Sequence, residues 1–172
     1  MKKVLFISAL LIGLTALSAQ AQRFAYIDTE YIMDNIPEYQ AAQRELDDVR
    51  VNWQQEIEAK FSEIDQMYKD YQSEAVLLPD EIKREREEEI IEKEREAKAL
   101  QMQRFGREGD LFQRREELIK PIQDKIFEAV EEIASRGNYA VIFDKASGAS
   151  MIFTDVRYDL SDEVLQKMGY RR

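Results

Sequence analysis

The feature that most constrains this chain is a helical run of about seventy residues, from Glu38 to Glu108, with one interruption at residues 77–80. No glycine or proline occurs between Glu38 and Leu78, and apolar residues recur at steps of three and four. That spacing places them on one face of a helix. These residues are Leu46, Val49, Trp53, Ile57, Phe61, Ile64, Met67 and Tyr71.

The pair Pro79-Asp80 predicts that one helix ends and another begins. Proline keeps the preceding residue out of the helical region, yet it fits the first turn of a helix. A second helix is expected from Glu81, and two long helices joined by so short a link pack antiparallel as a hairpin. At 1.5 Å per residue the first helix would be roughly 60 Å long, so much of it would project from a compact body.

Residues 1–21 have the pattern of an export signal. Lys2 and Lys3 precede an apolar segment, residues 4–17, and a small-x-small cleavage site, residues 19–21. The apolar segment is short for a membrane span, although an uncleaved anchor is the alternative interpretation. The sequence therefore predicts an exported chain, and the absence of cysteine excludes a lipid anchor at the cleavage site.

Composition excludes several classes of function. Without Lys2 and Lys3, 23 basic residues remain against 35 acidic ones, a net charge of −12, which argues against a nucleic-acid binder and against adsorption to anionic lipid. The chain has no cysteine and no histidine, so it lacks thiolate sites and the commonest metal ligand and general base. We expect no catalytic residues, no metal and no cofactor. An enzyme that uses only carboxylates, such as Asp28, is a remaining alternative to Asp28 acting as a helix cap.

Short β segments flank the helical run. Residues 24–28 predict a strand, after which Asp28 caps a short helix. Residues 139–144 predict a strand buried on both faces, and residues 151–154 a last strand in a hairpin with it. So small a sheet favours burial by oligomerisation. The residues expected at that interface are Phe24, Tyr26, Ile27, Val141, Ile142, Phe143, Met151 and Phe153.

Two glycines, Gly106 and Gly109, weaken the returning helix. They predict either a flexible joint or close packing against a bulky residue of the outgoing helix. Apolar periodicity then returns as far as Ile133, with a kink expected at Pro121 and a left-handed cap at Gly137.

The order of these elements resembles the outer-membrane-protein chaperones of the Skp/OmpH type over the whole mature chain. A strand after the signal peptide is followed by a long charged hairpin, and Pro121-Ile122-Gln123 then leads into the strand at 139–144. Residues 155–165, DVRYDLSDEVL, are similar to the closing family pattern, which ends in D-[LI]-[ST]-x-x-V-L. A terminal helix is expected there, from Glu163 to Met168.

The resemblance implies an α+β fold and a periplasmic homotrimer. In that family, strands of three subunits form a small body, and three coiled-coil arms surround a cavity that holds unfolded outer-membrane β-barrel proteins without ATP. Carried onto this chain, residues 22–37 and 110–172 would form the body. Residues 38–109 would form the arm, with its tip near 77–80.

Weak, adaptable and multivalent contacts suit such a chaperone, and a two-helix arm leaves side chains off its seam exposed. The alternative for each arm residue is packing in the hairpin seam. The residues expected to contact clients are Trp53, Phe61, Met67, Tyr68, Tyr71, Leu77 and Leu78.

The charge of the chain departs from that of the family, whose well-studied members are basic. The acidic balance argues against lipopolysaccharide or membrane contact, so clients would be held by apolar contacts or by local basic patches. The candidate basic residues are Arg104, Arg107, Arg114 and Arg115. An alternative function is a coiled-coil tether or spacer of the cell envelope that binds no client.

Overall fold

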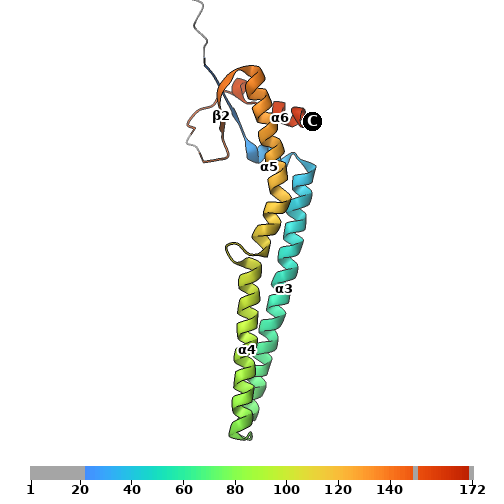
Figure 1. Cartoon of the computed structure of the whole chain (residues 1–172), viewed down its shortest axis with the longest axis vertical. Coiled ribbons are helices and arrows are strands. Elements are labelled where there is room, and N and C mark those ends of the chain that lie inside the picture. The colour runs from blue at the N-terminus through green and yellow to red at the C-terminus, as the bar shows by residue number, and fades with distance from the viewer. Residues whose placement is uncertain (1–21, 149–150, 171–172) are drawn as a thin grey trace, which may run out of the picture. The chain divides into compact units, whose positions relative to one another are not determined.

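A computed structural model describes residues 22–148 and 151–170, so the expected export signal lies outside the described residues. The chain divides into two compact units. One is the helical unit, residues 33–126, and the other is the flanking unit, formed by the segments on either side of it. Figure 1 shows the elements along the chain. They are β1 (Arg23–Ile27), α2 (Thr29–Asp34), α3 (Pro37–Glu74), α4 (Asp80–Phe105), α5 (Asp110–Gly137), β2 (Tyr139–Asp144), the 3-10 helix η2 (Val156–Tyr158) and α6 (Ser161–Lys167).

The predicted helical hairpin is confirmed. Helix α3 runs unbroken for 38 residues, and α4 returns beside it after a turn that ends at Pro79, whose backbone is extended. Both helices begin one residue before the expected position. The seam between them buries apolar side chains from both helices, which removes apolar surface from water. The buried residues of the two helices in this part are Ile57, Ile64, Ile90 and Ala97.

The glycine pair marks a break between α4 and α5. A Cβ atom on Gly106 would lie 2.3 Å from the backbone oxygen of Met102, and one on Gly109 would lie 2.5 Å from that of Gln103. The chain therefore folds back tightly onto the last turn of α4. The expected close packing exists, but against the backbone of α4 and not against a bulky side chain of the outgoing helix.

After the break, the first half of α5 packs against the first half of α3 (Figure 1). Ala42, Leu46 and Ile119 form a buried cluster there, with Leu111 and Leu118 packed against it. Helix α5 then continues through Pro121 as far as Gly137. The hairpin is thus one long outgoing helix opposed by two shorter returning ones.

The flanking unit contains a small parallel sheet. Strands β1 and β2 pair with Ala25 opposite Ile142 and Tyr26 opposite Phe143. The helices between the two strands supply the long crossover that parallel pairing needs. The predicted fold class, a long helical hairpin with a small sheet, is therefore confirmed.

The predicted third strand at 151–154 is wrong, and so is the hairpin with residues 139–144. Those residues are irregular and pair with neither strand, and a different segment occupies the second edge of β1. The amide of Leu160 donates to the backbone oxygen of Tyr26 at 2.9 Å, and Asp159 forms an isolated bridge with Tyr26. The C-terminal segment therefore pairs with β1 just before α6 begins, two residues earlier than expected.

Two further expectations for this unit are corrected. Strand β2 is not buried on both faces within one protomer, since Val141 is 41% and Phe143 45% exposed. A sheet of two strands has too little structure around it to cover them.

The left-handed residue after α5 is Asn138, with φ of 50°, and not Gly137. Gly137 is needed for another reason, because its Cβ would lie 2.3 Å from the Tyr139 ring.

We predict that Gly106→Ala destabilises the hairpin by about 1–3 kcal/mol, because the added methyl overpacks against a backbone oxygen that cannot rotate away. Urea unfolding followed by circular dichroism measures this. Glu108→Ala, an exposed change in the same link, is the control and should stay within about 0.5 kcal/mol of the parent. An unchanged midpoint for Gly106→Ala would show that the link relaxes freely.

Candidate functional site

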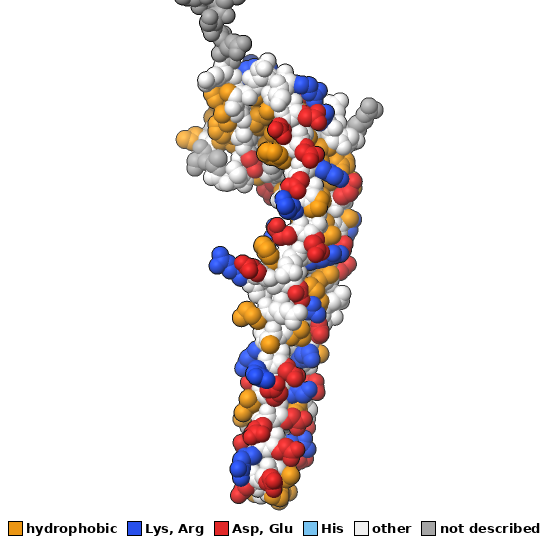
Figure 2. Space-filling view, in the orientation of Figure 1, with side chains coloured by type: hydrophobic (Ala, Val, Ile, Leu, Met, Phe, Trp, Pro, Cys, Tyr) orange, Lys and Arg blue, Asp and Glu red, His pale blue; other side chains and the backbone are white. Residues whose placement is uncertain are grey.

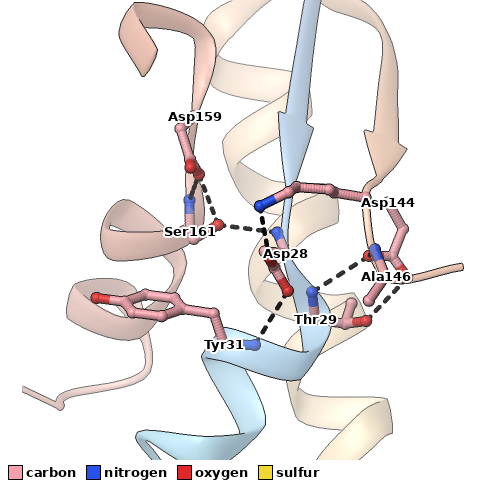
Figure 3. Close-up of polar contacts among 8 residues, drawn as sticks. Asp28, Thr29, Tyr31, Asp144, Ala146, Asp159 and Ser161 are labelled. Atoms are coloured by element: carbon pink, nitrogen blue, oxygen red, sulfur yellow. Dashed lines mark hydrogen bonds and ion pairs between the residues drawn. The ribbon is translucent and has the colours of Figure 1, made fainter. Parts of the chain in front are cut away.

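A network of polar side chains joins the end of β1 to the C-terminal segment (Figure 3). The amide of Asp28 donates to Ser161 Oγ at 2.9 Å, and Ser161 Oγ donates to Asp159 Oδ1 at 2.6 Å. On the other side, Thr29 Oγ1 donates to Asp144 Oδ2 at 2.8 Å. Lys145 Nζ lies 3.1 Å from Asp28 Oδ2. The network therefore ties together β1, β2 and the start of α6.

The bonding in this network favours a structural role over a catalytic one. Ser161 is 2% exposed, and its hydroxyl already donates to Asp159 and accepts from the backbone of Asp28. Asp28 accepts from the amide of Tyr31 at 3.1 Å, as expected for a cap of α2. That bond, aided by Lys145, lowers the pKa of Asp28, and a carboxyl of low pKa is a poor general base near neutral pH. Among the described residues, no three histidine, cysteine or acidic side chains are grouped as metal ligands.

The helical unit places four of the expected client-contacting residues against the seam. Phe61, Met67 and Tyr71 pack against the buried cluster formed by Ile64, Ile90 and Ala97. The Trp53 ring meets Phe105 edge-on at 6.4 Å between centroids, and the Arg104 guanidinium lies 4.5 Å from the Trp53 centroid. These side chains are only partly exposed, so part of each surface supports the hairpin itself.

Other apolar side chains of the arm stand out into solvent. Tyr68 is 51% exposed and Leu77 is 85% exposed at the turn, whereas Leu78 is partly buried. Six further exposed apolar residues of this unit lie outside the predicted set. They are Val51, Val76, Ile82, Ile91, Met102 and Phe112.

One signal could have identified Ile91. It follows Ile90, which is buried in the seam, and neighbouring residues on a helix differ in direction by about 100°. Figure 2 shows such apolar side chains as separate patches among charged ones along the hairpin. The arm therefore offers small, spaced apolar contacts to a partner instead of one continuous apolar face.

The arginines of the expected basic patches are partly neutralised. Arg104 lies 2.6 Å from Asp110 and 4.0 Å from Glu56, and Arg114 pairs with Glu45 and Glu117. The far part of the arm, residues 56–96, carries 15 acidic residues against 7 basic ones, a net charge of −8. The electrostatic character of the arm is thus acidic toward its tip.

The flanking unit has an open apolar groove of about 630 Å³ beside β1. Phe24 and Phe143 line it and are about half exposed, and Phe153 is 84% exposed. Ile27, in contrast, is buried within the protomer at 6% exposure. Five residues expected at the subunit interface therefore share one groove: Phe24, Tyr26, Phe143, Met151 and Phe153.

Comparison with known proteins places almost all of the described chain in one family. The family model described as outer membrane protein (OmpH-like) matches residues 23–168. A solved structure from Caulobacter crescentus CB15, provisionally described as an OmpH-like outer membrane chaperone, has the same fold with a TM-score of 0.70. The two chains are 8% identical, and the match covers 88% of this chain and 86% of that one. No curated protein matches the sequence, and no described helix is long and apolar enough to cross a membrane.

The polar network makes folding sensitive to acid. The folded-state pKa of Asp28 lies below its ordinary value, so its contribution to stability is present above about pH 4 and is lost as the pH falls through the folded pKa. We expect Asp28→Asn to lose less free energy of unfolding than the parent between about pH 6 and pH 3.

Urea unfolding at a series of pH values measures the difference. Asp34→Asn, an exposed change on α2, is the control and should follow the parent curve. Parallel curves for all three proteins would show that Asp28 contributes nothing to the acid sensitivity.

Proposed function

The chain belongs to the OmpH-like family of outer membrane proteins, and we propose that it is an ATP-independent holdase chaperone of the periplasm. Its clients would be unfolded outer-membrane β-barrel proteins. Strands of such barrels alternate apolar and polar residues and cannot satisfy their backbone until they pair in the membrane. They need a partner that covers apolar side chains without fixing one conformation.

The observation that carries this proposal is the spacing of exposed apolar side chains on an otherwise charged arm. Leu77, Ile91 and Met102 are each more than 60% exposed, and the surface of the hairpin shows separate apolar patches among charged side chains (Figure 2). Isolated apolar contacts are weak singly, but several of them act together on one flexible chain. Side chains such as methionine also adapt to differently shaped partners.

We further propose that the open groove beside β1 is the surface through which three copies assemble. Phe143 and Phe153 expose large aromatic surfaces in a groove that one protomer leaves open. Contiguous apolar surface of this kind marks an interaction site. Assembly would place several arms at one client and raise its effective affinity without any new type of contact.

One observation favours a second candidate, a structural tether. Phe61, Met67 and Tyr71 pack along the hairpin seam, as they would in a spacer that holds no client. The two functions differ in what the exposed residues do. In a tether, Leu77 and Ile91 contact no client, whereas a holdase requires them for client binding.

Light scattering of the mature protein, alone and with a urea-unfolded β-barrel diluted into it, tests the holdase. We expect a trimer that gains the mass of one barrel and keeps it soluble. The variant Leu77→Ser/Ile91→Ser/Met102→Ser should keep the trimer and its helicity but hold several-fold less barrel, since it loses three apolar contacts.

The matched control is Gln72→Ser/Gln101→Ser, which changes exposed polar positions on the same helices and should hold barrel as the parent does. A barrel that precipitates equally with and without the parent protein would rule out the holdase and favour the tether.

Assembly can be tested apart from client binding. We expect Phe143→Asp to give monomers with intact helices, because Phe143 is exposed in the protomer and the charge becomes buried only on assembly. Sedimentation velocity measures the mass, and Ile91→Asp is the control for the same change on the arm. A Phe143→Asp variant that stays fully assembled would place the interface elsewhere.

A further inference from the structure

The tip of the hairpin contains a small pocket of about 150 Å³ between the end of α3 and the first part of α4. Its lining combines apolar side chains with three charged ones. Ile90, at 6% exposure, and the partly buried Met67, Tyr71 and Leu78 form its apolar part. The charged residues are Asp70, Glu74 and Arg86, all of which are exposed.

The charges around the pocket do not balance. Asp70 accepts an amide hydrogen from Gln66 at 2.8 Å, and neither Asp70 nor Glu74 has a cationic partner among the described residues. Arg86 lies 3.5 Å from Glu89 on its own helix. Since Asp70 and Glu74 are four residues apart on α3, their like charges repel each other along the helix.

This combination defines the chemistry of an occupant. We propose that the pocket binds a lysine or arginine side chain of an unfolded client polypeptide. The aliphatic stem packs against Met67 and Leu78, and the cationic head lies between the carboxylates of Asp70 and Glu74. Long basic side chains bury their stems on apolar surface while the charge stays near water, and a charged donor bonds strongly to carboxylate.

The size of the pocket agrees with a single side chain. Sites for whole small molecules have volumes of about 300–1,000 Å³, larger than the 150 Å³ here. A divalent cation is a poorer fit, because calcium takes six to eight oxygen ligands, whereas the pocket lining contains only two carboxylates, and Arg86 lies beside them.

The residues around the pocket also favour a client segment that contains a basic residue. Val76 and Leu77 in the adjacent turn are 90% and 85% exposed, so apolar residues next to the basic one gain contacts there. The charge of −8 over residues 56–96 attracts positively charged chains and speeds their encounter. The arm tip thus selects segments in which basic and apolar residues are mixed. This inference rests on the proposed holdase function and names the kind of client segment held at the tip.

A pair of labelled synthetic peptides tests the proposal on the full mature chain. Both are unstructured and about twelve residues long, with the same apolar residues; one carries three lysines where the other carries three glutamines. Fluorescence anisotropy measures their affinities for the parent protein, for Asp70→Asn/Glu74→Gln, and for Glu85→Gln/Glu88→Gln. The last variant removes the same charge from exposed positions of α4 outside the pocket.

We expect the parent to prefer the lysine peptide and Asp70→Asn/Glu74→Gln to bind it about tenfold more weakly, because two exposed ion pairs are lost. The glutamine peptide should bind the parent and Asp70→Asn/Glu74→Gln with equal affinity. Glu85→Gln/Glu88→Gln should weaken lysine-peptide binding less than threefold, an effect of overall charge that salt removes.

Equal losses in the two variants, or no preference of the parent for lysine, would overturn the pocket as a binding site. Circular dichroism of each variant shows whether the hairpin is intact. The light-scattering assay with the unfolded barrel separates the two proposals. If the parent protein keeps the barrel soluble but binds both peptides equally, only the proposed lysine-binding pocket is refuted. If the barrel precipitates in the presence of the parent protein, the holdase function is refuted.

Discussion

A hairpin of two helices can bury only one seam, and most properties of this arm follow from that constraint. Where α3 faces α4, the buried residues are Ile57, Ile64, Ile90 and Ala97, and positions outside the seam face water. The charged residues of α4 keep those positions soluble, but ion pairs between exposed side chains contribute little stability. Apolar residues such as Ile91 and Met102 therefore stay exposed, because the hairpin has no second layer to cover them.

The flanking unit meets a related constraint in a different way. A two-stranded sheet cannot enclose a core, so hydrogen bonds and an ion pair between side chains stabilise part of the unit instead. Hydrogen bonds to Asp144 and Ser161 fix the end of β1 to the end of β2 and to the start of α6. Leu160 occupies the second edge of β1, yet the groove lined by Phe24 and Phe143 stays open. The unit is thus held together by specific bonds, while this apolar groove stays open.

The sequence predicts the helices well because their signals are local. Pro79 and the spacing of apolar residues set the hairpin, and the glycine pair marks the break before α5. That residues 151–154 form no strand could not be predicted, since their composition is strand-like. The pairing of Leu160 with Tyr26 joins residues far apart in the sequence and has no local signal. The exposure of arm residues could be predicted only in part. Two adjacent isoleucines such as Ile90 and Ile91 cannot both lie in one seam, but the sequence alone does not decide which of them is buried.

In the proposed holdase, acidic charge and exposed apolar residues together limit which segments the arm binds. Charge alone would attract any basic chain and would fail as salt screens it beyond about 8–10 Å. Apolar contacts alone would bind unfolded chains without preference for their sequence, and they would promote association between arms. At the tip the two features meet, because Asp70 and Glu74 border a pocket that also contains Met67 and Leu78. A segment that satisfies both must carry a long basic side chain among apolar neighbours, and repulsion between acidic arms opposes their association.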